Sequence, residues 1–467
     1  MNSVERGPIS LWVASDLGEV WLALMEGDRP YELILRSEEQ ARLLGAIFKG
    51  RVSGQARAVG ASFVEIGGVR DAFLMDGRAN EANPPALGDE LLIQIVREAD
   101  GGKGPRATRH LTLAGWSLVF APVGPSGVSR RIDDLVERER LKGILDALAP
   151  EGTGLIARTS AVGATREELE QERDELVERW NMVLTKAAAV RAPALVHRDE
   201  DPALPWLRDH LALAPVRIVV DGPGSEDRKQ ALQRVAGLPP IETFSGPLPA
   251  VEAMHLDREL SGALSAHVPL PSGGRLIIES TEALTAIDVN SGSDFTSTTL
   301  EETATRTNLE AIPEIVRQIL LRDLAGMVLI DFIDMVRGEN RARVDEALGM
   351  ELTRDRSKLR TLPLTDFCLA QITRQRRRPS LARLMLQPCS CCRRGQVLRP
   401  ETQARQLLRQ LRTMARPRPS GRFTLAAPQP VLEAAREIAE KWGRACGLPA
   451  SSQISYAIGE IDLAVNR

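Results

Sequence analysis

The fold is decided between Thr281-Glu-Ala-Leu-Thr-Ala-Ile-Asp288-Val-Asn290-Ser291 and Met327-Val-Leu-Ile-Asp331-Phe-Ile-Asp334-Met335, two apolar runs that each finish in acidic side chains. A helical segment lies between them, and Thr299 with Glu302 three residues later has the form of a capping box at its start. Two strands joined by a helical crossover lie side by side in one sheet. We therefore expect the two acidic strand ends to meet.

These strand ends carry the residue types of a magnesium site. Residues i and i+2 of a strand share a face, so Asp288 and Asn290 project together, and Asp331 ends the second strand. Asp334 would face away if that strand continued. Mg²⁺ takes one or two carboxylates and keeps several waters, and it can neutralise charge on a phosphodiester. The alternative is structural: Asp288 and Asn290 cap a turn, and Asp331 caps a helix.

Length and composition indicate an ordinary globular protein. The 467 residues predict roughly two to four domains, and 43% hydrophobic with 26% charged residues is typical of that class. No apolar run is long enough for a membrane span, and the first residues lack a secretory pattern, so we expect a cytoplasmic protein. The net charge of −3 does not indicate a nucleic-acid binder, but the arginines are clustered locally.

Three of the five cysteines crowd into Cys389, Cys391 and Cys392. An odd, clustered set favours a reducing compartment over a disulfide framework. Cys389 and Cys392 form half of a tetrahedral Zn²⁺ site, which the same pair of a second chain would complete, so the pattern predicts an even oligomer. Alternatives are a redox pair or unligated buried thiols, and Cys391 offers a different ligand.

A small β-barrel is expected over residues 37–110, where short strands alternate with glycine turns. Phe63, Phe73 and Lys103 lie in this region, and aromatic rings with nearby cations are how such barrels hold single-stranded nucleic acid. The alternative is that both rings belong to the barrel core. The N-terminal hairpin, residues 9–36, is too short to stand alone and is expected to pair with the strand Val216–Val220.

Two arginine motifs can bind phosphate groups. Arg158 and Thr159 follow a strand, and a guanidinium beside a hydroxyl matches phosphate oxygens. Arg374 and Arg376 belong to an arginine cluster just before the cysteines, and such clusters bind phosphates in a salt-dependent way. In both cases the alternative is a solvated arginine on a surface loop.

The motifs taken together resemble the RNase E/G family of bacterial endoribonucleases, over roughly Leu22 to Gly395. The resemblance rests on segments found in the family's order: Thr285-Ala-Ile-Asp288-Val-Asn290, Glu302-Thr-Ala-x-x-Thr-Asn308, Ile330-Asp331-Phe-Ile-Asp334, Arg374-Gln-Arg376 and Cys389-x-x-Cys392.

The resemblance implies cleavage of single-stranded, often A/U-rich RNA to 5′-phosphate and 3′-hydroxyl ends. Under it Asp288 and Asp331 match Mg²⁺ ligands, and Asn290 matches the residue that positions the phosphate. Phe63, Phe73 and Lys103 match RNA-binding positions. The remaining matches are a pocket that senses a 5′-monophosphate and a Zn-link between protomers: Gly115, Val119, Arg158 and Thr159, then Cys389 and Cys392. A further pocket arginine of the family is Lys358 here, which keeps the charge but loses the bidentate fork.

The family's layout implies an α/β multidomain chain. Residues 1–36 with 200–265 resemble an RNase H-like subdomain, 37–110 an S1-type OB barrel, and 111–199 the 5′-sensor region. Residues 266–386 resemble a DNase I-like catalytic subdomain, 387–396 the Zn-link, and 397–467 a small C-terminal oligomerisation domain.

We therefore expect an Mg²⁺-dependent endoribonuclease of rRNA/tRNA processing or mRNA decay, assembled as a homodimer or homotetramer. The chain ends soon after the small domain, which is typical of the short, RNase G-like form without a scaffold tail. The alternatives are a non-catalytic RNA-binding scaffold, which would not need Asp288, Asn290 and Asp331 together, and a nuclease directed at DNA.

Overall fold

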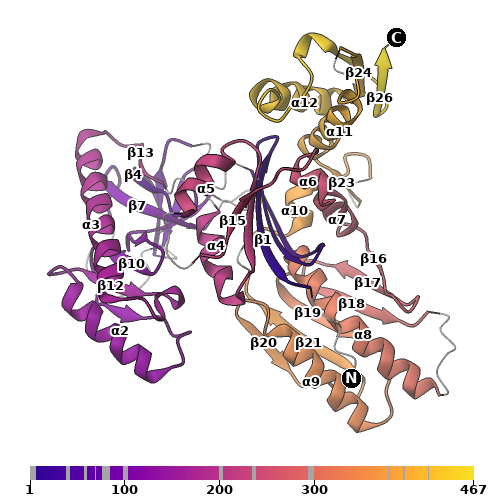
Figure 1. Ribbon diagram of the computed structural model, residues 1–467, viewed down its shortest axis with the longest axis horizontal. Coiled ribbons are helices and arrows are strands. Elements are labelled where there is room, and N and C mark those ends of the chain that lie inside the picture. The colour runs from indigo at the N-terminus through magenta and orange to yellow at the C-terminus, as the bar shows by residue number, and fades with distance from the viewer. Residues whose placement is uncertain are drawn as a thin grey trace. The chain divides into compact units, whose positions relative to one another are not determined.

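The computed structural model describes residues 7–37, 43–56, 60–68, 70–75, 85–97, 104–198, 203–233, 238–292, 299–376, 378–392, 395–418 and 420–466 (Figure 1). The chain divides into two compact units. Unit 1 comprises Met1–Leu35, Val219–Glu226 and Glu242–Arg467, and unit 2 comprises Arg36–Ile218 and Asp227–Ile241. Both units mix helices with sheets, so the predicted α/β class is confirmed.

Unit 2 contains the predicted barrel. Its strands follow one another as β4 (Ile47–Ala56), β5 (Ala61–Glu65), β6 (Ala72–Met75), β8 (Arg106–Thr108) and β7 (Glu90–Arg97). The barrel closes because β7 also pairs with β4, which is consistent with an OB-like fold, and β13 (Ala194–His197) pairs with β4 as well. A Cβ on Gly50 would lie 2.4 Å from Val64 Cγ1, so only glycine fits at that strand crossing.

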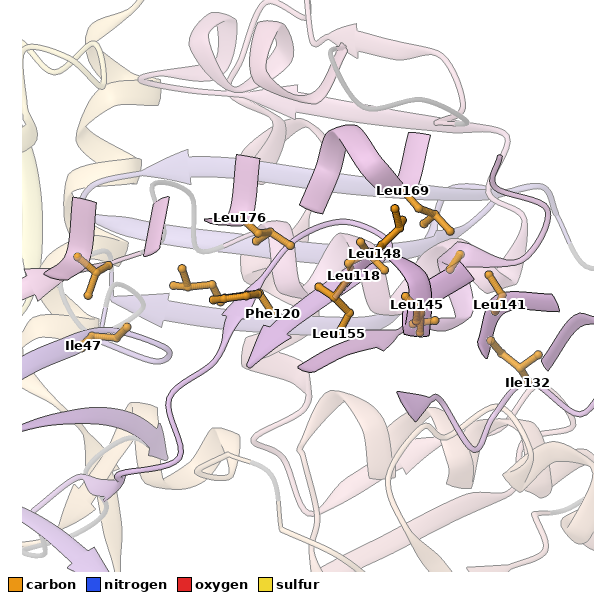
Figure 2. Close-up of a cluster of buried hydrophobic side chains, with 14 of the residues drawn as sticks. Ile47, Leu118, Phe120, Ile132, Leu141, Leu145, Leu148, Leu155, Leu169 and Leu176 are labelled. Carbon is orange, nitrogen blue, oxygen red and sulfur yellow. The ribbon is translucent and has the colours of Figure 1, made fainter. Parts of the chain in front are cut away.

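The rest of unit 2 is a four-stranded sheet covered by helices. The sheet runs β11 (Gly127–Val128), β12 (Gly154–Ala157), β10 (Leu118–Ala121) and β9 (Leu113–Ala114). Its leucines and Phe120 pack against α2 (Leu135–Leu148) and α3 (Arg166–Ala189), as Figure 2 shows. The helix α3 begins with a capping box between Thr165 and Glu168. Unit 2 also contains the short helices α4 (Leu204–His210), η2 (Thr159–Ala161) and η3 (Leu211–Leu213).

The first sheet of unit 1 contains the N-terminal hairpin. The strand order in this sheet is β15 (Ile241–Thr243), β14 (Arg217–Asp221), β1 (Ile9–Asp16), β2 (Glu19–Glu26) and β3 (Arg29–Ser37). The predicted pairing of the strand near Val216–Val220 with the hairpin is confirmed. The unit boundary runs through β14 and β15, and α5 (Ser225–Gln233) lies between them in sequence. Helices α6 (Ala250–Ala253), α7 (Leu256–Gly262) and α10 (Leu381–Met385) contribute to its hydrophobic core.

The second sheet of unit 1 holds the opening stretch. Its order is β16 (His267–Pro269), β17 (Arg275–Ser280), β18 (Leu284–Asn290), β19 (Gly326–Asp331), β21 (Leu369–Arg374) and β20 (Leu359–Leu362). β18 and β19 are parallel and are joined through α8 (Leu300–Leu321), as predicted. Thr299 caps α8, accepting the Glu302 N–H at 3.2 Å. Asp323, at φ 47°, takes the left-handed position after the helix, and Gly326 follows with φ 92°.

The two faces of this sheet differ. Thr285, Ile287 and Val289 of β18 are buried, and α8 packs against this strand. Residues between them, such as Ala286 and Asp288, are exposed or partly exposed. The alternation therefore leaves an open face that carries the acidic side chains. The helix α9 (Gly338–Leu352) packs on α8.

Buried ion pairs attach the C-terminal region to the N-terminal hairpin. Asp16, the last residue of β1, accepts hydrogen bonds from Arg409 Nε at 2.8 Å and Arg412 Nη1 at 2.7 Å, and Arg409 also binds Glu19 at 2.8 Å. Burial alone would raise the pKa of Asp16, but the two guanidinium groups outweigh it and lower that pKa. Both arginines belong to α11 (Pro400–Ala415), which packs on α12 (Gln429–Trp442).

The remaining strands are β22 (Leu386–Pro388) with β23 (Gln396–Leu398), and the sheet β25 (Ile454–Ile458), β24 (Arg422–Ala427), β26 (Asp462–Asn466), with η4 (Ser451–Gln453) before β25. In the part of the chain that the structure describes, no helix has both the length and the apolar character needed to cross a membrane.

Candidate active site

Asp288 and Asp331 lie directly opposite each other where β18 and β19 run side by side. Because the strands are parallel and in register, both carboxylates project from the same face of the sheet. Asn290 lies two residues after Asp288, and its Nδ2 donates a hydrogen bond to Asp288 Oδ2 at 2.5 Å. This bond fixes the orientation of the Asp288 carboxylate beside Asp331. The predicted meeting of the two acidic strand ends is confirmed.

The Asp331 carboxyl group titrates in a crowded acidic environment. Partial burial raises its pKa first, and the negative charges of Asp288 and Asp334 raise it further. Asp334 therefore acts on the same site, although the alternation argument pointed it to the other face. That argument fails because β19 ends at Asp331, so alternation no longer applies three residues later.

Polar side chains of α8 form hydrogen bonds to the loop that carries Asp334. Asn308, 0% exposed, donates to the Ile333 carbonyl at 2.8 Å and accepts the Ile333 N–H at 3.0 Å. Glu301 accepts the N–H groups of Val336 and Arg337 at 2.9 and 3.0 Å. Sequence reasoning assigned no role to Asn308 or Glu301. The available signal was Asn308 itself, a polar residue with Ala304, Ala311 and Ile312 at helical spacing around it.

Residues of α9 and of the turn before β21 also form hydrogen bonds to this loop. Arg341 Nη1 donates to the carbonyls of Met335 and Val336 at 2.8 and 2.9 Å. The buried Cys368 thiol accepts the Met335 N–H at 3.2 Å. The loop after β19 is thus bonded on both sides, which favours a preorganised site.

The arrangement fits Mg²⁺ better than a softer metal. In the ranges that the structure describes, no group of three or more His, Cys, Asp and Glu side chains is arranged to enclose a metal. Mg²⁺ does not require such a cage, because it binds through one or two carboxylates and retains water. The two adjacent carboxylates lie on an open face, and partial burial together with the charge of Asp288 raises the pKa of Asp331, so a divalent cation would stabilise this donor set.

Phe63 and Phe73 face each other across β5 and β6 of the barrel in unit 2. Their ring centroids are 5.6 Å apart and their planes meet at 64°. Phe63 is 40% exposed, and neither ring belongs to the barrel's buried cluster. The alternative that both rings are barrel core is therefore wrong. Lys103, the third residue of this prediction, lies outside the described residues.

Four of the predicted phosphate-pocket residues come together in unit 2. Val119 of β10 pairs with both Ala114 and Ile156, which places it between the strands that precede Gly115 and Arg158. The Arg158 N–H donates to the Ser117 carbonyl at 2.8 Å, and Thr159 follows directly. Lys358 belongs to unit 1, where it is exposed just before β20.

The turn within this group is organised by one acidic side chain. The Glu172 carboxylate of α3 accepts the Ser117 N–H at 3.0 Å through each of its oxygens. A Cβ on Gly115 would lie 2.0 Å from Glu172 Oε1, so a larger residue at this position would displace the Glu172 carboxylate from the turn. Sequence reasoning did not identify Glu172.

The fold buries Arg374 of the arginine cluster and leaves Arg376 exposed. Arg374 is only 2% exposed, and its guanidinium binds Asp355 at 2.5 Å, Asp323 at 2.5 Å and the Leu324 carbonyl at 2.9 Å. This placement contradicts a direct contact between Arg374 and RNA, because all three guanidinium nitrogens already donate hydrogen bonds to groups of the protein. Arg378 is also paired, with Asp323 and Glu32, whereas Arg376 is exposed.

The cysteine cluster lies at the end of the β22–β23 hairpin. The Cys389 N–H donates to the Gly395 carbonyl at 2.8 Å, and the Gly395 N–H donates to Cys392 Sγ at 3.2 Å. Backbone N–H groups of Cys392 and Cys391 lower the pKa of the Cys389 thiol by hydrogen bonding to it. Such bonds favour the thiolate that metals bind. Cys391 and Cys392 are exposed, so the alternative of three buried thiols is wrong.

Comparison with protein families matches residues 112–377 to the Ribonuclease E/G family. These residues include the carboxylate pair, the phosphate-pocket group and Arg374. The match begins after the barrel and ends before the cysteine cluster.

Individual relatives cover more of the chain. Ribonuclease E of Haemophilus influenzae is 33% identical over 420 residues, covering 85% of this chain and 45% of that protein. Ribonuclease E of Escherichia coli is 34% identical over 403 residues, covering 81% of this chain and 38% of that protein. The chain thus spans less than half the length of these two relatives. Ribonuclease G of Salmonella typhimurium is 31% identical over 475 residues, covering 96% and 94% of the two chains.

Proposed function

Because this chain belongs to the Ribonuclease E/G family, we propose that it is an endoribonuclease whose catalytic centre is the Asp288–Asp331 pair. The observation that carries the proposal is the in-register, parallel placement of these two carboxylates on an open sheet face. A protein that only binds RNA gains nothing from two like charges held side by side, since they repel each other.

The reaction follows from the chemistry of the site. An Mg²⁺ ion bound by the Asp288 and Asp331 carboxylates would act as the Lewis acid of phosphodiester hydrolysis. A water oxygen bonds to phosphorus while the bond to the 3′ oxygen breaks, leaving a 3′-hydroxyl and a 5′-phosphate. Asn290 holds the Asp288 carboxylate through its Nδ2, and we propose that it also orients the attacked phosphate.

Other parts of the chain would recognise the RNA. The exposed edge of Phe63 with Phe73 offers stacking surface for unpaired bases, and Arg376 offers an exposed charge for phosphate. Arg158 and Thr159 would bind a 5′-monophosphate together with Gly115 and Val119. Lys358 provides one positive charge without the fork of an arginine, so the preference for a 5′-monophosphate is expected to be modest.

We propose that this activity serves rRNA/tRNA processing or mRNA decay in the cytoplasm.

One incubation tests the endoribonuclease activity against the two alternatives, an RNA-binding scaffold and a DNA-directed nuclease. Labelled single-stranded RNA and DNA of one sequence are mixed with the protein in Mg²⁺ or in EDTA. We expect cleavage of RNA in Mg²⁺ only, with 5′-phosphate on the downstream product. RNA binding without cleavage would identify a scaffold protein, and equal cleavage of DNA would identify a DNA-directed nuclease.

Removing the exposed barrel ring is expected to weaken RNA binding without unfolding the barrel. Stacking of one base on an aromatic ring contributes about 1–3 kcal/mol, so Phe63→Ala should raise the Kd for a single-stranded oligonucleotide by roughly 5- to 150-fold. Fluorescence anisotropy measures the change. Val96→Ala, at an exposed apolar position of β7 in the same barrel, is the matched control and should bind normally. Equal affinity of Phe63→Ala and wild type would remove Phe63 from the RNA surface.

We also propose that Cys389 and Cys392 bind a structural Zn²⁺ shared with the same pair of a second protomer, giving a homodimer or homotetramer. The hydrogen bonds to their sulfur atoms support this, because they stabilise thiolates. Cys389→Ser should therefore release Zn²⁺ and lower the particle mass, as measured by metal analysis and light scattering.

Cys391→Ser is the informative companion variant. If Cys392 is the second ligand, this variant keeps both its Zn²⁺ and its mass. Loss of Zn²⁺ in Cys391→Ser with retention in Cys392→Ser would assign the ligand to Cys391 instead. Unchanged mass with no Zn²⁺ in the wild-type protein would contradict the shared site altogether.

A further inference from the structure

Phe367 lies in the turn between β20 and β21, two residues before β21 begins, and 79% of it is exposed. The register pairs Asp331 with Leu369, and the Phe332 N–H donates to the Cys368 carbonyl at 3.2 Å. Phe367 is therefore two residues away from the partner of Asp331, so the Cα atoms of Phe367 and Leu369 are at most about 7 Å apart. No role followed from its position in the sequence.

The turn that carries this ring is held rigidly. The Thr365 N–H donates to the Leu369 carbonyl at 3.1 Å, and Thr365 Oγ1 accepts the Leu369 N–H at 3.0 Å. Asp366 forms an ion pair with Arg341 at 3.2 Å, the same arginine that binds the loop after Asp331. The ring is thus presented by an ordered turn rather than by a loose loop.

Cys368, directly after the ring, has the left-handed backbone angle φ 55°. A non-glycine residue in this region costs free energy and persists where the surrounding structure enforces it. Cys368 is fully buried, and its thiol accepts the Met335 N–H. The chain accepts this strain while it leaves the neighbouring aromatic ring in water, which points to a binding role for the ring.

Arg341 links the turn of Phe367 to a segment with apolar and positive side chains. It pairs with Asp366, the residue before Phe367, and also binds the Val336 carbonyl. Val336 is 87% exposed, and Arg337 after it is exposed as well. Aromatic surface with an adjacent guanidinium matches a nucleobase joined to a phosphate. A few exposed side chains around acidic groups offer much less apolar area than a stable protein interface needs.

We propose that Phe367 stacks on the base of a nucleotide that flanks the scissile phosphate. This inference rests on the proposed endoribonuclease function, since the nearby carboxylates then hold that phosphate. The stacking surface belongs to unit 1 and is separate from the Phe63–Phe73 pair of unit 2. A ring at the cleavage centre makes the reaction sensitive to the base at one position beside the cut, whereas the barrel rings govern overall affinity.

A fluorescent base tests the stacking without requiring cleavage. In an Asp331→Asn background, RNA oligonucleotides carry 2-aminopurine at one position at a time, and each is bound to saturation. We expect additional quenching at one position near the cut, lost in Phe367→Ala and retained in Phe367→Tyr. Met350→Ala removes a comparably exposed apolar side chain from α9 and should leave the quenching unchanged.

Cleavage kinetics provide the second readout. Phe367→Ala should lower kcat/KM by about 5- to 150-fold on intact RNA, and this loss should vanish when the stacked nucleotide is abasic. Quenching that is identical in Phe367→Ala at every position would overturn the stacking. A lower particle mass of Phe367→Ala in light scattering would also overturn it and assign the ring to a contact between copies. Quenching in the Asp331→Asn background without any cleavage of the same RNA by the wild-type protein would instead refute the endoribonuclease activity alone.

Discussion

Replacing Asp331 with Asn is expected to abolish RNA cleavage while RNA binding survives. The substitution keeps the shape of the side chain. It removes one of the two negative charges, those of Asp288 and Asp331, that would bind the cation. The loss of catalytic charge stabilisation should lower single-turnover cleavage by on the order of 10³-fold or more. Binding, measured by anisotropy, should change little, because the aromatic and arginine surfaces remain intact.

The same variant should show an opposite effect on stability. A carboxyl group with a raised pKa in the folded state binds protons more tightly there than in the unfolded chain. Its ionisation therefore destabilises the fold above the raised pKa, and this penalty fades as the pH falls below it. Without Mg²⁺ at neutral pH, Asp331→Asn should melt at a higher temperature than the wild type. Adding Mg²⁺ should raise the melting temperature of the wild type and not that of the variant.

Glu279→Gln is the matched control, since it removes an exposed carboxylate from β17 of the same sheet. It should cleave normally and keep the response to Mg²⁺. If Asp331→Asn lost RNA affinity in parallel with activity, or responded to Mg²⁺ like the wild type, Asp331 would not be a metal ligand.

Arg374→Ala is expected to cause the largest loss of stability, about 3–5 kcal/mol in the free energy of unfolding. Arg374 neutralises Asp323 and Asp355, and both carboxylates are buried. Burial alone would lower the pKa of Arg374, but the charges of Asp323 and Asp355 raise it overall, so the folded state favours the guanidinium. Removing it would leave two acidic groups in the interior with one partner fewer.

Urea denaturation of the two neighbouring variants separates structure from RNA binding. Arg376→Ala should change stability by no more than about 0.5 kcal/mol, because this side chain is exposed. It should also reduce the salt dependence of RNA binding by about one phosphate contact. A stable Arg374→Ala protein with weakened RNA binding would restore the original prediction that Arg374 contacts RNA.

The carboxylate pair could be predicted from sequence because it depends on local pattern and one topological rule. Thr285, Ile287 and Val289 alternate with the polar side of β18, and a helix between two strands makes them parallel neighbours. These two facts bring Asp288 beside Asp331 without knowledge of any distant contact. The capping of α8 by Thr299 was predictable for the same reason.

The roles of Arg374 and Asp334 could not be predicted in this way. The partners of Arg374 lie 51 and 19 residues away, and no periodicity marks a pair of acids as its buried neighbours. The place of Asp334 depends on the path of the chain after β19, where the Ile333 and Met335 N–H groups donate to Asn308 and Cys368 instead of continuing the strand. In both cases the deciding interaction joins segments that the local pattern treats as independent.

The ion pairs between the N-terminal hairpin and α11 have a consequence for the time course of biosynthesis. Arg412 follows Asp16 by 396 residues. At a translation rate of about 5–20 residues per second, the ribosome needs roughly 20–80 s to deliver this arginine after the aspartate. All residues of unit 2 precede Glu242 and emerge during that interval. The hairpin is therefore the first segment of unit 1 to be synthesised, and its carboxylates remain hydrated until α11 leaves the ribosome.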